Sequence, residues 1–206
     1  MKHNLESCIA IIQDPNIQDF VRILLETAPS EFYTDPCSGT GQHHPPEDQQ
    51  VGGILIHTKK AVQVALSLMR FYGLDQGQKE YWLLRDQIIA AVILHDLYKN
   101  GIPWGKSTHP EHGDIAAKEL EKWARRTILP IQCTDFIADL VRYHMGQWTK
   151  PDSKMAIVVR NIPSIHSNLK LDSESVLIAH LIVQTADYLA SRKWCPFTID
   201  QLDPLG

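Results

Sequence analysis

Six side chains of types that commonly bind metal ions occur along this chain, and they combine imidazole with carboxylate. In order they are His57, His95, Asp96, His109, His144 and Asp187. Histidine nitrogens and aspartate oxygens together suit Mn²⁺, Fe²⁺, Ni²⁺, Co²⁺ or Mg²⁺ better than a closed structural zinc site. Two such ions would activate water and bind the attacking and leaving oxygens of a displacement at phosphorus. The residue types therefore indicate hydrolysis of a phosphate ester or anhydride.

Most of these side chains fall where an amphipathic helix would turn an apolar residue toward the core. In the segment 53–72, GILIHTKKAVQVALSLMRFY, His57 lies on the apolar stripe. The same pattern leads to His95-Asp96 in DQIIAAVILHDLYK, to His144 in FIADLVRYH and to Asp187 in SVLIAHLIVQTADYLA. One such histidine is more often a hydrogen-bonded core residue. Because a buried carboxylate is costly unless it is paired or binds a cation, the repeated pattern favours a metal site between helices.

The adjacent pair His95-Asp96 indicates how two ions could share this site. One carboxylate has two oxygens, so Asp96 is expected to bridge the ions. His57, His95 and Asp187 would complete the ligands of the first ion, and His109 and His144 would hold the second. His112 is close to His109 in the sequence and is the alternative ligand for the second ion.

The elements that must position these residues all read as helices, because no clear strand alternation is present. We expect an all-α fold with helices near 17–27, 53–72, 80–98, 112–126, 131–145 and 173–192. Two polar segments, one from Glu31 to Gly53 and one from Asn100 to Gly113, are predicted to be loops. The interpretation is one domain over 1–206, with a metal-site core at about 40–194 and an N-terminal helical extension at 1–39.

The bulk composition of the 206 residues limits the classes of partner. The formal net charge of −4 provides no global basic field for long nucleic acid. Four cysteines without a CxxC pair are typical of reduced thiols in a cytoplasmic protein. No signal peptide and no membrane-spanning stretch can be recognised. We therefore expect a cytoplasmic protein with a small phosphorylated substrate, and the tail and N-terminal helix leave room for a homodimer.

The ordered pattern H…HD…H…H…D resembles the HD-domain metal-dependent phosphohydrolase superfamily over residues 40 to 194. HDLYK is similar to the HD-x-x-K signature, and HPEHG is similar to an HPEIG-like motif whose spacing selects His109 as the ligand. RYHMG and TADYLASRK resemble motifs of HD-type dinucleoside polyphosphate hydrolases. HH…GGILIHT resembles the segment before the first ligand in HD-type 3′-5′ exoribonucleases.

This resemblance implies an HD-domain helical bundle with two divalent ions between its core helices. It implies a substrate that is a nucleotide, a dinucleoside polyphosphate or a short oligonucleotide. Long RNA is a less favoured substrate, because the sequence contains no oligonucleotide-binding domain of the kind that such exoribonucleases carry.

Residues outside the ligand set are expected to bind the substrate. Asp96 and Lys99 are the predicted catalytic residues, because Lys99 could offset charge that develops on the phosphate. Arg192 is a candidate phosphate ligand, and His43 and His44 could line the entrance of the site. The simpler interpretations are a solvated lysine at a helix end, a surface arginine and polar loop histidines.

Two other functions are compatible with the same ligands. Some HD-like proteins use them to hold a mixed-valent di-iron centre that oxidises a small polyol or phosphonate with O₂. A non-catalytic nucleotide-binding module on a degenerate scaffold is the other alternative. Degenerate copies usually lose the HD pair or the distal aspartate, and this sequence has both, so the hydrolase is the preferred hypothesis.

Overall fold

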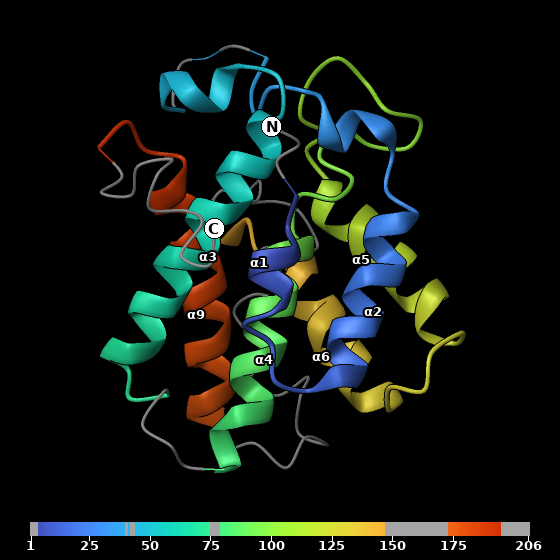
Figure 1. Cartoon of the computed structure of the whole chain (residues 1–206), viewed down its shortest axis with the longest axis vertical. Helices are drawn as coiled ribbons and strands as arrows, with labels where there is room; N and C mark the ends of the chain where they lie inside the picture. Colours follow the sequence, from blue (N-terminus) through green and yellow to red (C-terminus); the bar gives the residue numbers. More distant parts are fainter. Residues whose placement is uncertain (1–3, 40, 42–43, 75–78, 147–172, 195–206) are drawn as a thin grey trace.

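The computed structural model describes residues 4–39, 41, 44–74, 79–146 and 173–194. The prediction of an all-α fold is confirmed, because these residues form seven α-helices, two 3₁₀ helices and no strand (Figure 1). The α-helices are α1 (Glu6–Ile9), α2 (Pro15–Glu26), α3 (Gly53–Phe71), α4 (Lys79–Leu94), α5 (His112–Ala124), α6 (Ile131–Arg142) and α9 (Ser173–Ala190). The 3₁₀ helices η1 (Ser30–Tyr33) and η2 (Pro46–Gln49) lie in the first predicted loop.

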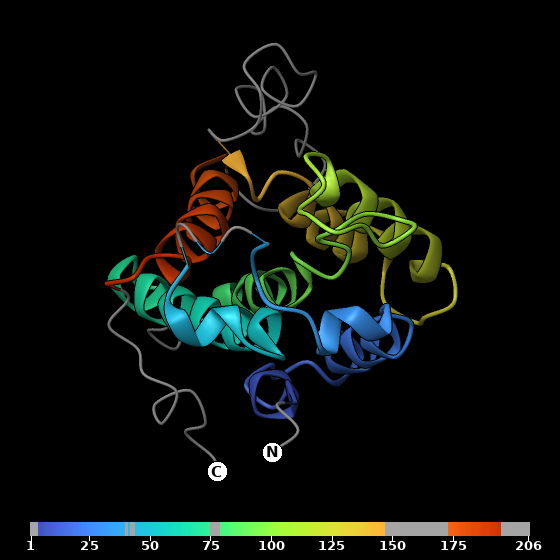
Figure 2. The ribbon, with the colours of Figure 1, turned by 90° about the horizontal axis from the view of Figure 1, so that it is seen from above.

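Helix α4 occupies the centre of the bundle. Its run from Ile88 to Leu94 consists of apolar residues that are all buried, as expected for a helix that is covered on every side. It packs against α1, α2, α3, α6 and α9, and the end-on view shows these helices arranged around it (Figure 2). None of the described helices combines the length and apolar character needed to span a membrane.

The N-terminal segment is packed directly onto this centre. Helix α2 starts at a proline, and the Asp14 side chain caps it by accepting the N–H groups of Asn16 and Ile17. Its apolar face, which includes Phe20 and Leu24, is completely buried. The carboxylate of Asp86 in α4 accepts the backbone N–H groups of residues 13 and 14 at 2.8 Å. These bonds join the start of the chain to the central helix.

The helix ends differ from the predicted ones where the predicted ligands lie. Helix α4 ends at Leu94 rather than 98, and α6 ends at Arg142 rather than 145. The pair His95-Asp96 and His144 therefore lie just beyond the C-terminal ends of their helices. His57 lies in the first two turns of α3, which runs in the direction opposite to α4 and α9 (Figure 1). Helix C-termini carry partial negative charge, which favours a cation at this end of the bundle.

Candidate metal centre

A first donor group consists of His57, His95, Asp96 and Asp187. One ligand atom from each residue lies within 4.8 Å of the others. His57 Nε2 is 3.0 Å from Asp187 Oδ1 and 3.3 Å from His95 Nε2, and His95 Nε2 is 3.3 Å from Asp96 Oδ2. Ligand atoms about 2.1 Å from a shared ion lie about 3.0 Å apart at right angles and about 3.4 Å apart at tetrahedral angles. The first donor group therefore has the spacing of a coordination shell.

A second donor group consists of Asp96, His112 and His144, again within 4.8 Å of one another. Asp96 Oδ1 lies 3.3 Å from His112 Nε2, and His112 Nε2 lies 2.9 Å from His144 Nε2. The other carboxylate oxygen of Asp96, Oδ2, faces the first donor group. Asp96 thus directs one oxygen toward each group.

Hydrogen bonds to the backbone fix the orientation of three imidazoles. His95, His112 and His144 each place Nδ1 at 2.6 to 2.7 Å from the carbonyl oxygen three residues earlier, which belongs to Val92, His109 and Val141 respectively. A carbonyl oxygen can only accept, so each Nδ1 carries a proton, and a ring that carries no second proton has a bare Nε2. This arrangement of the second ring nitrogen is typical of metal-binding histidines.

The bare nitrogens make this cluster suited to a cation. The Nε2 atoms of His112 and His144 face each other at 2.9 Å. When both rings are neutral with the proton on Nδ1, their two lone pairs repel each other unless positive charge lies between them. In addition, the Nδ1 atom of His57 is buried without a hydrogen-bond partner among the described residues. Mixed nitrogen and oxygen donors of this kind fit Mn²⁺, Fe²⁺, Ni²⁺, Co²⁺ or Mg²⁺.

The ionised carboxylates of the two donor groups also favour a bound cation. Burial opposes ionisation of Asp96 and Asp187, but Lys99, His95 and His112 hold the pKa of Asp96 well below the usual range, and His57 and His95 do the same for Asp187. Burial also disfavours a proton on His95, yet the two carboxylates raise its pKa to about 10. Burial and the neighbouring imidazoles lower the pKa of His144 to about 3. Two ionised carboxylates therefore attract positive charge to this point, and a cation can replace the proton.

The Lys99 side chain reaches into the centre and is buried. Its Nζ donates to Asp96 Oδ2, and this carboxylate raises the pKa of Lys99 despite its burial. The ammonium group is therefore charged and lies beside the shared aspartate. The solvated lysine of the simpler interpretation is wrong, whereas the catalytic role of Lys99 stays a prediction.

The structure places His112, and not His109, in the second donor group. His109 lies in the loop before α5, where its ring contacts Gly101 and its Nδ1 accepts the N–H of Glu111. His112 is the first residue of α5 and faces the end of α6. His112 is brought to this position because α5 and α6 approach each other closely at Gly113, where a Cβ atom would lie 2.8 Å from the carbonyl oxygen of Arg142. The spacing of the HPEHG motif predicted His109 as the ligand, whereas the structure brings its neighbour His112 to this position; a metal-binding role of His109 stays a prediction.

The predicted substrate-binding residues lie in different surroundings. The guanidinium of Arg192 stacks 4.0 Å above the Tyr188 ring, and its Nε donates to the Tyr188 carbonyl oxygen. His44 faces Cys37 and Asp48 and is mostly buried, unlike the polar loop histidine of the simpler interpretation. His43 lies outside the described residues. Roles of Arg192, His43 and His44 in substrate binding stay predictions.

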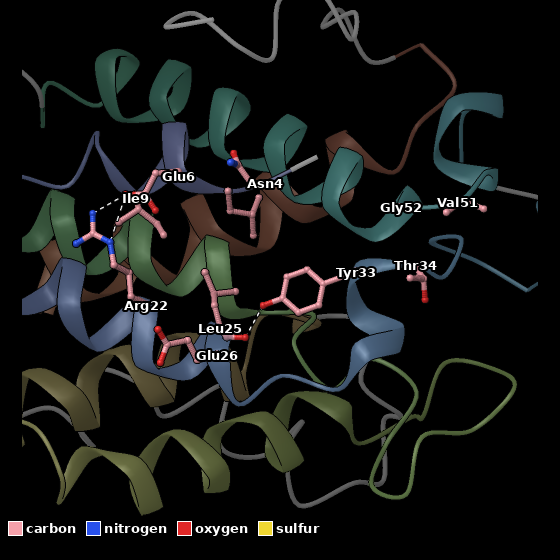
Figure 3. Close-up of a pocket in the computed structure, with 11 residues that line it drawn as sticks. Asn4, Glu6, Ile9, Arg22, Leu25, Glu26, Tyr33, Thr34, Val51 and Gly52 are labelled. Atoms are coloured by element: carbon pink, nitrogen blue, oxygen red, sulfur yellow. Dashed lines mark hydrogen bonds and ion pairs between the residues drawn. The ribbon is translucent and has the colours of Figure 1, made fainter. Parts of the chain in front are cut away.

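A cavity of about 790 Å³ lies outside both donor groups. Its wall includes Leu5, Ile9, Leu25 and Val51, and the Arg22–Glu6 ion pair lies at its edge (Figure 3). The Tyr33 hydroxyl points into this region and donates to the Leu25 carbonyl oxygen. None of the predicted ligands or substrate-binding residues lines this cavity.

Comparison with known proteins identifies relatives of the whole metal-centre region. The HD domain family model matches residues 54–192, which include every member of the two donor groups. Over 99 residues the chain is 31% identical to 3′-5′ exoribonuclease YhaM of Geobacillus sp. (strain WCH70), a match that covers 48% of this chain and 26% of the relative. Over 189 residues it is 25% identical to 3′-5′ exoribonuclease YhaM of Bacillus velezensis, which covers 86% of this chain and 55% of the relative.

The match thus spans about a quarter of the length of the Geobacillus relative and about half of the length of the Bacillus relative. No solved structure matches it significantly.

Proposed function

Because the chain belongs to the HD domain family, we propose that it is a divalent-metal-dependent phosphohydrolase that acts at the two donor groups. HD domains are metal-binding domains, and the residues of both groups have the types and spacings for this role. The finer proposal is one ion at each group. Its metal is Mn²⁺, Fe²⁺, Ni²⁺, Co²⁺ or Mg²⁺, according to the ligand types.

One observation carries this proposal, namely the position of Asp96 between the two groups. Its Oδ2 lies 3.3 Å from His95 Nε2, while its Oδ1 lies 3.3 Å from His112 Nε2. A carboxylate shared in this way would hold two cations a few ångströms apart. Such a pair supplies an activated water and positive charge for the oxygens of a phosphoryl displacement.

The chain's own residues would orient and stabilise the substrate around this centre. Backbone carbonyls hold the rings of His95, His112 and His144 so that their Nε2 atoms point inward. Lys99 holds a buried positive charge beside Asp96. A phosphate oxygen that approaches Asp96 would meet this ammonium group, which would stabilise negative charge as it develops in the transition state.

Among nucleotides, dinucleoside polyphosphates and short oligonucleotides, we propose a short oligoribonucleotide as the substrate. The two relatives described above are named 3′-5′ exoribonucleases, which supports removal of nucleotides from a 3′ end. The net charge of −4 supports a short substrate rather than a long polyanion. The products would then be nucleoside monophosphates.

The test combines elemental analysis with a substrate panel on wild type and Asp96→Ala. We expect two metal equivalents and cleavage of a short RNA in wild type, with loss of both ions and of cleavage in Asp96→Ala. Asp19→Asn, a change of an exposed α2 carboxylate, is the control and should behave as wild type.

Three results would contradict parts of the proposal. Failure to take up metal would overturn the metal centre itself. Metal-loaded protein that cleaves no RNA, nucleotide or dinucleoside polyphosphate would overturn the hydrolase. Two iron equivalents with oxygen-dependent oxidation of a polyol or phosphonate would instead support the di-iron oxygenase.

A further inference from the structure

A third group of metal-type side chains lies beside the first donor group. It consists of Cys37, His44 and His57, each of which offers one ligand atom within 4.8 Å of the others. We propose that these three residues form a third cation site, which takes a thiophilic divalent ion such as Zn²⁺. This sulfur-containing site is separate from the hydrolytic centre proposed above, although it shares His57 with it.

The distance between the ligand atoms of its two loop residues is close to the value expected for joint ligation. Cys37 Sγ lies 3.8 Å from His44 Nε2. With bonds of about 2.3 Å to sulfur and about 2.0 Å to nitrogen, a tetrahedral ion places these atoms about 3.5 Å apart. A shift of a few tenths of an ångström would therefore bring both atoms into one coordination shell.

A buried carboxylate orients the imidazole of His44 toward the cysteine. His44 Nδ1 lies 3.5 Å from Asp48 Oδ2, and neither atom has another hydrogen-bond partner among the described residues. The Asp48 side chain is 0% exposed, and Lys60 Nζ donates to its other oxygen at 2.8 Å. A carboxylate behind one ring nitrogen, with the other nitrogen directed at the ion, is the usual arrangement of a metal-binding histidine.

His57 connects the third site to the first donor group. Its Nε2 faces His95 and Asp187, whereas its Nδ1 is buried and has no hydrogen-bond partner in the part of the chain that the structure describes. The His44 and His57 rings meet edge to face with centroids 5.2 Å apart. A buried polar nitrogen without a partner is unfavourable. A cation between these rings and Cys37 would bind this nitrogen once its proton has left, and His57 would then bridge two ions as an imidazolate when its Nε2 also binds one.

The backbone holds the loop residues in place without an ion. The Cys37 N–H donates to the Asp48 carbonyl oxygen at 2.8 Å, which closes the loop between them. This carbonyl also lies against the start of α3, where a Cβ atom on Gly53 would be only 2.0 Å from it. Glycine at 53 therefore allows the loop to pack directly onto the helix that carries His57.

The sulfur ligand gives the third site a metal preference of its own. Both donor groups of the hydrolytic centre contain only nitrogen and oxygen ligands, whereas thiolate favours Zn²⁺ and other softer ions. Burial raises the pKa of the Cys37 thiol, so the ion must displace the thiol proton when it binds. When the first donor group also holds an ion on His57 Nε2, the His57 ring must lose its remaining proton as well, and both protons go to solvent.

Cobalt substitution tests this proposal, since a thiolate ligand to Co²⁺ produces a near-ultraviolet charge-transfer band that nitrogen and oxygen ligands do not. Metal-free protein would be titrated with Co²⁺ beyond two equivalents. We expect the band to appear, to saturate at one sulfur-bound ion per chain and to disappear when Zn²⁺ is added. The band reports sulfur ligation alone, so this result is independent of whether the protein hydrolyses RNA.

Three variants make the assignment specific. Cys37→Ser should abolish the band. His44→Gln should lower the apparent affinity for the sulfur-bound Co²⁺ ion at least tenfold. Cys133→Ser, a change at a buried cysteine in α6, should leave the band intact. Far-ultraviolet circular dichroism identifies the folded variants. If Cys37→Ser does not fold, the Co²⁺ titration of His44→Gln tests the third site instead. The proposal is overturned if cobalt-loaded wild type shows no band, or if a folded Cys37→Ser or His44→Gln variant retains it unchanged.

Discussion

The Nε2 atoms of His112 and His144 face each other across 2.9 Å, while the Nδ1 atom of each ring lies 2.6 to 2.7 Å from a backbone carbonyl oxygen. This relationship joins the first residue of α5 to the residue that follows the end of α6. It arises because both rings donate Nδ1–H to a backbone carbonyl three residues earlier. Two acceptor nitrogens held face to face require positive charge between them, and their replacement should therefore remove a cation.

His112→Gln should weaken binding of the second ion by about 100-fold or more, because changes in residues behind metal ligands already reduce affinity by about 10- to 100-fold. The first ion should remain. His109→Gln is the matched control, since its ring lies outside the cluster, and it should bind both ions normally. Calorimetric titration with Mn²⁺ measures both affinities. Equal losses in the two variants would contradict the placement of His112.

Gly113→Ala should disturb the same site through the backbone. The added Cβ would lie 2.8 Å from the Arg142 carbonyl oxygen, so the start of α5 must move away from α6. We expect a loss of about 1 to 3 kcal/mol in the free energy of unfolding and weaker binding of the second ion.

Leu120→Ala provides the comparison for Gly113→Ala, because Leu120 is buried farther along α5. It should lower stability, by about 2 to 5 kcal/mol, without changing the affinity for the second ion. Urea unfolding and metal titration measure the two effects separately. Normal binding of the second ion by Gly113→Ala would show that the helix approach does not position His112.

Lys99→Met should reduce kcat by about 100-fold, because a buried cation beside the reacting phosphate would be lost. Metal binding should be retained or become tighter, because Lys99 Nζ donates to Asp96 Oδ2 and its positive charge repels a metal ion that binds to the same carboxylate. Steady-state kinetics and metal titration separate these two effects. Lys118→Met, which changes an exposed lysine of α5, should alter neither, and an unchanged kcat in Lys99→Met would argue against a role in catalysis.

Asp48→Asn should destabilise the fold by about 3 kcal/mol at pH 7, because it removes one partner of the completely buried Lys60. Burial raises the pKa of Asp48, but His44, His57 and Lys60 outweigh this effect and lower it below the usual value. The ionised carboxylate therefore stabilises the folded state above about pH 4, and this contribution is lost as the pH falls through the folded-state pKa.

The stability difference between wild type and Asp48→Asn should consequently shrink in acid. Urea unfolding at neutral and acidic pH, in the presence of a chelator, measures it without a contribution from bound metal. Glu47→Gln removes the more exposed partner of Lys60 and should have the smaller effect. A pH-independent difference would show that Asp48 does not act through its charge.

Local pattern was sufficient to identify six of the seven α-helices of the described residues and most members of the two donor groups. Apolar residues at helical spacing predicted six helices, and the structure has a helix at each of these places. The periodicity overestimated α4 because Leu97 and Tyr98 are also buried, although the chain has already left the helix at Leu94. A residue in a turn can face the core as well as one in a helix, so periodicity alone does not locate the helix end.

The sequence alone indicated the all-α fold, the family membership suggested by the H…HD…H…H…D order, and candidate ligands on the apolar faces of helices or just beyond their ends. These features need no knowledge of tertiary contacts, because each helical stripe is complete within a few turns and the order of the motifs follows the chain. Only the tertiary structure distinguished His112 from His109, since the choice depends on the approach of α5 to α6 at Gly113. It alone brought Cys37 and His44 to His57, because a loop closed by the bond from Cys37 to Asp48 leaves no periodic signal along the chain.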